Sequence, residues 1–445
     1  MKKILAILLV ALFLLSACAN GGGSSGSGAS GGTKEIRFMS METPGNPNHE
    51  IMMAMIEQFM ADNPDVIVEA DLMPSAELRT KITVEMAAGN PPEIGSIIPS
   101  YAWEFMRGDL IEDWRPIMAN HPEFEQMIPL SVILDMEYED GRIMSMPFEA
   151  SMDALYINKE IFDANGWALP ETFDDLLDLC AKARQAGIHL MVTGGRDIRF
   201  AWLATVMLSR TGGYEAIGRL TRGDAQDQWS NPEFGFPSML EHFAQLVAAE
   251  IYPPDVLAFS GLDADQFFAR GEAAMYYEGA WKPQNFVTAG GTEFTDKLIR
   301  IDYPAFPNGY PGGDPDVRVG GSTWGLMIPV GHSPEIFDAC IRFAKAHLNP
   351  EVNAKMMETG GRIFAGAANT TWDSTKTMPI FNQCVEAFET ATRTVLPLDA
   401  LVAPAIDLAI KQTVMPGIVA GEMTVQQAVD FVQMTAEEHL RAIGG

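Results

Sequence analysis

Cysteine and histidine are scarce in this sequence of 445 residues, and neither forms a pattern typical of a reactive site. The four cysteines, Cys18, Cys180, Cys340 and Cys384, contain no C-x-x-C pair, and the seven histidines contain no H-E-x-x-H motif. These spacings are typical of zinc and redox sites, so their absence argues against such functions. The sequence also lacks a P-loop and a G-x-G-x-x-G motif, and we therefore expect no metal and no cofactor.

Positive charge is also in short supply. The chain carries 30 lysines and arginines against 59 aspartates and glutamates, which gives a formal net charge of −29. A surface of this sign repels nucleic acid and disfavours polyanionic ligands, so we expect no nucleic-acid partner. The acidic residues are spread along the chain, as is typical of a soluble extracytoplasmic surface.

Long apolar runs are absent except at the very start, where two lysines precede about a dozen apolar residues. This run is too short to span a bilayer, which needs ~20 residues, but it fits a secretory signal. The small residues before Cys18 resemble the lipobox of bacterial lipoproteins, in which the cysteine becomes acylated after cleavage. We therefore predict a signal peptide at 1–17, lipidation at Cys18, and a Gly/Ser tether at 18–33. The alternative is an ordinary signal peptide with an incidental cysteine.

The rest of the chain is long enough for two domains, each with its own core. Its beginning alternates strands and helices. Apolar patterns predict strands at 34–40, 66–73 and 93–99, with a helix between each pair and Ser75 as the cap of the second helix. This order predicts a parallel α/β sheet, whose ligand crevice would be formed by the loops at 39–48 and 98–104.

Capping signals begin three later helices. They are Thr172 with Asp175, Ser333 before a proline, and Thr424 with Gln427. Cys180 and Cys340 fall on apolar faces of predicted helices, where a free thiol acts as a small hydrophobic group. One disulfide remains an alternative.

Five stretches in order carry a resemblance to a known family. They are the opening strand–helix–strand at 35–73, "NPPEIGSIIPS", "MPFEASMDALYINKEIFDANGWALPETFDDLLDLC", "FFARGEAAMYYEGAW" and "VGGSTWGLMIP". Together they resemble extracellular solute-binding protein family 1 of ABC importers, the group that includes maltose-binding protein.

The resemblance implies a two-lobed α/β architecture, the periplasmic-binding-protein type II fold, with a hinge and a ligand cleft between the lobes. The chain would cross between the lobes near 147–151, 317–322 and 370–378. The implied division is 34–147 plus 323–372 for lobe 1, and 150–317 plus 378–445 for lobe 2.

The resemblance also implies the function. The protein would be a monomeric, non-enzymatic substrate-binding component, held by its lipid anchor on the extracytoplasmic face of a bacterial membrane. It would capture a carbohydrate and deliver it to the transmembrane permease subunits. A binder of polyamines or other small polar solutes is the first alternative, because carboxylates beside an aromatic ring also suit a cation. A secreted glycoside hydrolase using Glu42 or Glu149 is the second, although no carboxylate pair is evident.

Trp281 is the leading ligand residue, because the family's tryptophan in this stretch commonly stacks on a sugar ring. Its alternative is an aromatic that caps the core. Glu149, at the first crossing, could accept hydroxyl hydrogen bonds or be a solvated hinge carboxylate.

Six further residues are candidates at the predicted cleft: Glu42, Ser100, Tyr101, Ser322, Trp324 and Arg362. Arg362 could line the cleft or pair with an acidic neighbour. One departure from maltose-type members is that "LPLDALVAPAIDLAIK" lacks their sugar-stacking aromatics, so maltose specificity should not be carried over.

Overall fold

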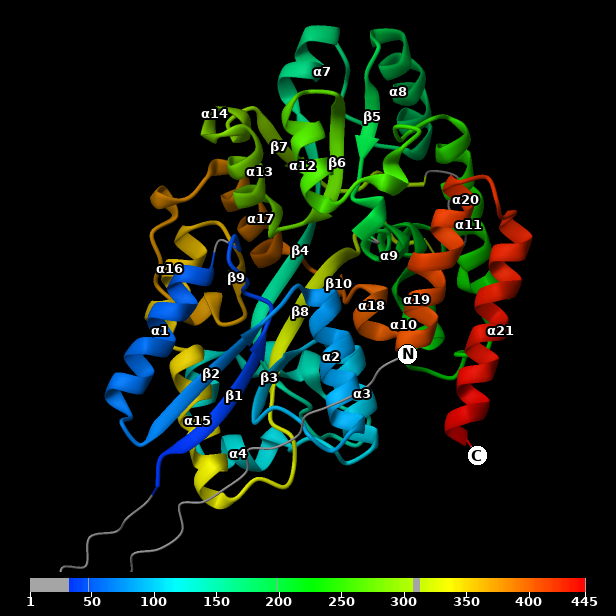
Figure 1. Cartoon of the computed structure of the whole chain (residues 1–445). Coiled ribbons are helices and arrows are strands. Elements are labelled where there is room, and N and C mark those ends of the chain that lie inside the picture. The colour runs from blue at the N-terminus through cyan, green and yellow to red at the C-terminus, as the bar shows by residue number, and fades with distance from the viewer. Residues whose placement is uncertain (1–31, 47, 198, 307–312, 445) are drawn as a thin grey trace, which may run out of the picture.

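The computed structural model describes residues 32–46, 48–197, 199–306 and 313–444 (Figure 1). The predicted signal peptide at 1–17, Cys18 and all of the tether except residues 32 and 33 lie outside the described residues. Among the helices that are described, none combines the length and the apolar character needed to cross a bilayer.

A mixed β-sheet forms the centre of the described structure. Its strands are β1 (Lys34–Ser40), β2 (Val66–Leu72), β3 (Ile94–Ile97), β4 (Met146–Asn158), β5 (His189–Val192), β6 (Ala273–Gly279), β7 (Leu298–Ile301), β8 (Arg318–Met327), β9 (Ile363–Phe364) and β10 (Thr394–Val395). The order is β2-β1-β3-β8-β4-β6-β5, with β10 beside β8 and with β7 and β9 beside β4. β1 runs parallel to β2 and β3, which confirms the predicted parallel unit.

Helices cover the sheet. The first half of the chain contributes α1 (His49–Asp62), α2 (Ser75–Ala87), α3 (Pro99–Arg107), α4 (Trp114–Asn120), α5 (Glu123–Met127), α6 (Leu130–Ile133), α7 (Lys159–Asn165), α8 (Phe173–Ala186), α9 (Ala201–Thr211) and α10 (Gly213–Thr221). The second half contributes α11 (Phe236–Ala248), α12 (Gly261–Ala269), α13 (Lys282–Gly290), α14 (Thr292–Thr295), α15 (Pro334–His347), α16 (Pro350–Glu358), α17 (Pro379–Thr390), α18 (Leu398–Leu401), α19 (Pro404–Leu408), α20 (Met415–Val419) and α21 (Val425–Gly444).

Single turns complete the secondary structure. The 3₁₀ turns are η1 (Leu134–Met136), η2 (Gly195–Asp197), η3 (Pro232–Phe234), η4 (Val256–Ala258), η5 (Ala367–Asn369) and η6 (Ser374–Lys376). The segment η7 (Ala409–Val414), between α19 and α20, is a π-helix.

Three of the four predicted helix caps are present. Thr172 and Asp175 form the capping box of α8, Ser333 accepts the hydrogen bond that starts α15, and Thr424 exchanges hydrogen bonds with its partner at the start of α21. The prediction for Ser75 is wrong. The N-cap of α2 is Pro74, whose extended backbone starts the helix one residue early, so Ser75 already lies inside it and caps nothing.

The predicted ligand loop at 98–104 is also wrong. β3 ends at Ile97, and α3 begins at Pro99, a residue whose fixed φ favours the first helical position. Ser100 and Tyr101 therefore lie in the first turn of a helix instead of a loop.

The strands β4 and β8 join two groups of elements, β1–β3 with their helices below and β5–β7 with theirs above, as Figure 1 shows. All 13 residues of β4 are buried. Its first half pairs with β8 and β9, and its second half pairs with β6 and β7. The backbones of β4 and β8 approach so closely that a Cβ at Gly320 would lie 2.5 Å from the carbonyl oxygen of Ser151.

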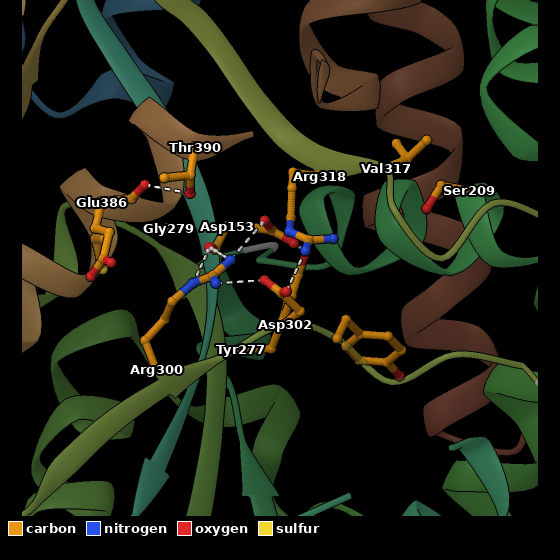
Figure 2. A network of polar contacts seen from close by, with 12 residues as sticks. Asp153, Ser209, Tyr277, Gly279, Arg300, Asp302, Val317, Arg318, Glu386 and Thr390 are labelled. Carbon is orange, nitrogen blue, oxygen red and sulfur yellow. Dashed lines mark hydrogen bonds and ion pairs between the residues drawn. The ribbon is translucent and has the colours of Figure 1, made fainter. Parts of the chain in front are cut away.

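A polar network, buried at Asp153 and partly exposed at Asp302 and Arg318, fixes the second half of β4 to its neighbours (Figure 2). The Tyr277 hydroxyl donates to the Asp153 carboxylate at 3.0 Å, and the Arg300 guanidinium donates to the Asp153 carbonyl at 3.2 Å. Asp302 then pairs with Arg300 at 2.5 Å and also with Arg318 at the start of β8. The network therefore links β4, β6, β7 and β8.

Two hydrophobic clusters form the core. One surrounds β1–β3, α1 and α15, and the other surrounds α8, α9, α11 and α21. The first cluster also includes Phe268 and Phe286, from the group of elements around β6, so packing continues across β4. Cys180, Cys340 and Cys384 are buried and free, which confirms the expectation of hydrophobic thiols for the first two.

Candidate functional site

Trp281 lies at the carboxyl end of β6, directly before α13. Its half-buried ring meets the ring of Trp202 edge to face, with 4.8 Å between centroids and 81° between planes. The indole lies over Gly279, where a Cβ would come within 2.0 Å of a ring carbon. The next residue, Lys282, is buried and donates to Asp265 at 2.6 Å, which fixes the turn. These contacts hold the indoles of Trp281 and Trp202 in place and leave both rings partly exposed to solvent.

The helix α9 connects this aromatic pair to α18 and α3. Trp202 lies in its first turn, and Thr205, three residues later, accepts a hydrogen bond from the Leu398 backbone N–H at 2.8 Å. The next residue of α18, Asp399, accepts a hydrogen bond through its carbonyl from the Ser100 hydroxyl at 2.6 Å. One of the predicted residues, Ser100, thus bridges α3 and α18 with its own side chain.

Three charged side chains, Arg79, Asp399 and Asp407, lie close enough to Tyr101 to affect the pKa of its hydroxyl. Arg79 of α2 lies 3.7 Å from the Asp399 carboxylate, and Asp407 of α19 pairs with Lys411 of the π-helix. Burial raises the pKa of Tyr101, Arg79 opposes that shift, and Asp407 and Asp399 add to it. Burial raises the pKa of Asp407 to about 6, while Lys411 opposes that shift. Together with Lys411, the group contains two positive and two negative side chains.

A surface hollow of roughly 370 Å³ lies beside the contact between α3 and α18. The Arg222 guanidinium stands 4.6 Å over the Trp103 ring and donates to the Ala400 carbonyl at 2.9 Å. Burial lowers the pKa of Arg222 to about 10, and Asp135 opposes the shift. A larger hollow of roughly 560 Å³, lined by residues of α7 and Lys297, is distant from these groups in the fold.

Glu42, Arg362 and Glu149 come together, but inside the protein. Arg362 donates to Glu42 at 2.9 Å and to Asn353 at 2.9 Å, so the alternative in which Arg362 pairs with an acidic neighbour is confirmed. Glu149 is only 6% exposed because β4 runs between β8 and β9 at this point. The alternative of a solvated hinge carboxylate is therefore wrong. Burial raises the pKa of Glu149 to about 8, against the effect of Arg362 and with a smaller contribution from Glu42.

Ser322 and Trp324 are also buried. The Ser322 backbone N–H donates to the Asp135 carboxylate at 2.9 Å, and its hydroxyl donates to the Val132 carbonyl at 2.9 Å. Trp324 packs within the first hydrophobic cluster. Both residues join β8 to its surroundings.

Five residues of this region were not predicted from the sequence: Arg79, Trp202, Asp399, Asp407 and Lys411. Asp407 and Lys411 had a usable signal, because an acid and a base four residues apart share one face of a helix. The others had none, since their contacts join distant segments. Within the described part of the chain, no group of three or more histidine, cysteine, aspartate or glutamate side chains is placed to hold a metal ion.

Comparisons with known proteins agree on the fold and the family. The family described as bacterial extracellular solute-binding protein has a model that matches residues 54–377. A probable sugar-binding periplasmic protein of Mesorhizobium japonicum is 27% identical over 257 residues, which are 56% of this chain and 56% of that protein. The sn-glycerol-3-phosphate-binding periplasmic protein UgpB of Shigella flexneri is 21% identical over 407 residues, which are 87% of this chain and 89% of that protein.

Two solved structures resemble the whole described fold. A chitin oligosaccharide binding protein has a TM-score of 0.79 at 20% identity, over 92% of this chain and 100% of that chain. Maltose-bound MalE3 of T. maritima has a TM-score of 0.75 at 20% identity, over the same shares of both chains. These likenesses confirm the predicted fold class, while the hinge, the cleft and the lobe boundaries stay predictions.

Proposed function

This chain belongs to the bacterial extracellular solute-binding protein family, and from that premise we propose that it captures a carbohydrate and delivers it to the permease of an ABC importer. Its family consists of binding proteins. The expectation of a non-enzymatic protein is thereby confirmed, and the glycoside hydrolase alternative is set aside.

The observation that carries the proposal is the pair of half-buried indoles, Trp281 and Trp202. An indole face suits the apolar C–H face of a pyranose, and its N–H can meet a hydroxyl. α9 leads from this pair to α18, where Asp399 lies 3.7 Å from Arg79 of α2, so hydrogen-bond acceptors and donors for sugar hydroxyls are present in this region. The names of the Mesorhizobium relative and of the two solved structures also refer to sugars.

A small cation is the second candidate. The formal charge of −29 favours it, and an indole face attracts a cation as well as a sugar. The two candidates differ in what they require of the charged residues near Tyr101, because a polyamine needs an excess of carboxylates.

Isothermal titration of the full chain with maltose, di-N-acetylchitobiose, raffinose, spermidine and sn-glycerol 3-phosphate tests the proposal. We expect at least one of the saccharides to bind. Trp281→Ala should weaken that binding about ten- to a hundredfold, because a buried aromatic contact contributes roughly 1.5–3 kcal/mol. Trp167→Ala is the matched control, since Trp167 is also half-buried against one aromatic ring, that of Phe162. Binding of spermidine alone would favour the second candidate, and equal losses in both variants would remove Trp281 from the site.

We further propose that Cys18 carries the lipid anchor and that the mature protein is a monomer at the extracytoplasmic face of the membrane. The order of apolar run, small residues and cysteine supports the anchor. Cys18→Ser should move the expressed protein from the membrane fraction to the soluble fraction. Mass spectrometry that finds Cys18 unmodified in the membrane-extracted protein would contradict the anchor.

We also propose that the chain has two lobes that close on the solute about a hinge, and that Glu42, Ser100, Tyr101, Glu149, Ser322, Trp324 and Arg362 line or support the closed site. The long strands β4 and β8, which connect the two groups of elements, support this arrangement. Small-angle scattering should show a smaller radius of gyration when a bound saccharide is present. An unchanged radius would contradict closure.

A further inference from the structure

A lysine and an aspartate lie in contact inside the group of elements around β6. The Lys282 ammonium donates to the Asp265 carboxylate, with 2.6 Å between Nζ and Oδ1, and the two side chains are 3% and 2% exposed. Burying two charges costs desolvation free energy that their mutual attraction can fail to recover. An amide bond between the two side chains would remove both charges from the interior.

Aromatic rings surround this pair. The Lys282 Nζ lies 5.1 Å from the centre of the Tyr276 ring. That ring packs against the rings of Phe268 and Phe286, and all three aromatic residues are fully buried. A wall of this kind excludes the water that would hydrate the charges and hydrolyse an amide, and burial favours the neutral forms of an amine and a carboxyl group.

Rigid elements hold the two side chains against each other. Asp265 lies in α12, which begins with a capping box of Ser260 and Asp263, and Lys282 is the first residue of α13, directly before Pro283. Because Cγ of Asp265 is bonded to Oδ1, the Lys282 Nζ lies within about 4 Å of Cγ, close to the ~3–3.5 Å that reacting atoms require. The amine and the carboxyl carbon are therefore held near the geometry of attack.

A third group beside the pair can carry a proton. Glu278 follows Tyr276 by two residues on β6 and is 2% exposed. Burial raises the pKa of Glu278, Arg199 and Lys282 oppose that rise, and Asp265 adds to it. The Glu278 Oε1 has no hydrogen-bond partner among the described residues. A carboxyl group that keeps its proton in this way can serve as a general acid toward a leaving oxygen.

We propose that Lys282 and Asp265 condense into an intramolecular amide, with Glu278 as the proton carrier. The ammonium first gives one proton to the Asp265 carboxylate, and the neutral amine then attacks Cγ. The Nζ–Cγ bond forms, one further amine proton passes through Glu278 to the departing oxygen, the Cγ–O bond breaks and one water leaves. Nothing is oxidised or reduced, so the step needs no co-reactant.

The bond links α12 to α13 and closes a loop that contains β6. A covalent cross-link stabilises a fold mainly because it restricts the unfolded chain. The cysteines of the described chain, Cys180, Cys340 and Cys384, are all free, so no disulfide among them supplies such a link. An amide also withstands reducing agents, which open disulfides. The inference goes beyond the proposed function, since it requires no solute.

Peptide mapping of the full chain by mass spectrometry tests the proposal. Trypsin separates residues 223–270, which contain Asp265, from residues 271–297, which contain Lys282. We expect the two peptides to appear as one joined species, lighter than their sum by one water. Recovery of both as separate, unmodified peptides overturns the inference. This measurement uses the wild-type protein and does not depend on the folding of any variant.

Two variants test the chemistry. Lys282→Arg keeps the positive charge but has no amine, so it should release the two peptides separately and unfold at a lower temperature than the wild type. Glu278→Gln keeps the shape of the side chain but cannot carry the proton, so it should reduce the joined species at least about tenfold. Equal joining in Glu278→Gln and the wild type would overturn the part assigned to Glu278.

The chain contains its own matched control in the buried pair of Lys411 and Asp407. The neighbouring carboxylate there, Asp399, is partly exposed and lies 3.7 Å from Arg79, so it stays ionised and is a poor proton donor. Trypsin should therefore cut after Lys411, which requires a free amine. Protection of Lys411 by an amide to Asp407 would show that a buried pair condenses without a group like Glu278, and would overturn the proton-carrier role.

Discussion

Glu149 makes the stability of this protein depend on pH in a way that one substitution should remove. Its folded-state pKa is about 8, against a usual value of 4.5, because burial disfavours the charged carboxylate more than Arg362 stabilises it. The folded protein therefore holds a proton on Glu149 at pH 6, while the unfolded chain has lost it. Glu149 stabilises the fold fully below pH 4.5, and this contribution is lost as the pH rises through 8.

The magnitude follows from the size of the shift. A difference of about 3.5 pH units, from 4.5 to 8, corresponds to roughly 5 kcal/mol, or about 1.4 kcal/mol for each unit of pH. Glu149→Gln keeps the shape and cannot ionise, so its free energy of unfolding should lack this slope. His347 has the opposite effect below pH 6.5, because burial and Arg362 keep the pKa of its folded-state ring well below the usual 6.5, and this effect is common to both proteins and cancels in their difference.

Urea denaturation of both proteins at pH 5, 6, 7, 8 and 9, at constant ionic strength, measures the effect. The free energy of unfolding of the wild type should fall relative to Glu149→Gln between pH 5 and 8, and the difference should level off above pH 8. Glu57→Gln, which removes one exposed carboxylate of α1, should follow the wild type. Parallel curves for the wild type and Glu149→Gln would refute the reasoning.

Three further predictions concern the interior. Glu42→Gln should lower the free energy of unfolding at pH 6 by about 3–5 kcal/mol, because it leaves the buried Arg362 charge without its 2.9 Å partner; a loss below 1 kcal/mol in urea denaturation would contradict this. Gly320→Ala should cost about 1–3 kcal/mol, since the new Cβ would lie 2.5 Å from the Ser151 carbonyl, and an unchanged thermal midpoint would show that the strands can separate there. Burial raises the pKa of three thiols, to about 12 for Cys180 and Cys340 and about 11 for Cys384. At pH 8 these thiols should react with Ellman's reagent only after unfolding, and fast labelling of the native protein would show that the interior is open.

The fold could be predicted wherever a signal is local. The alternation of apolar strands and helices in 34–99 specified the parallel pairing of β1 with β2 and β3, and Thr172 with Asp175 specified the start of α8. Two local predictions failed, the helix cap at Ser75 and the loop at 98–104 after β3. In both cases a proline decided where the helix begins, and its effect competed with the capping and loop signals.

The candidate site was harder to predict from the sequence, because whether a charged side chain is buried depends on partners that lie far away in the sequence. Glu42 was predicted at the ligand site, but nothing in its own stretch indicated that Arg362, 320 residues later in the chain, would pair with it. Asp399 and Arg79 meet only because α18 packs beside α2 and α3. Trp281 could be predicted as a ligand residue from the stretch that ends with it, "FFARGEAAMYYEGAW", whereas no pattern around Trp202 indicated that it would pack against Trp281.

The strand β4 has a further consequence for how the chain can be divided. Its first residues pair with β8 and β9, and its last residues pair with β6 and β7 of the same sheet. A cut anywhere within Met146–Asn158 would leave one fragment with unpaired strand edges that invite self-association. Split reporters and circularly permuted versions should therefore be opened at surface turns outside this strand, so that one uninterrupted β4 serves both sides.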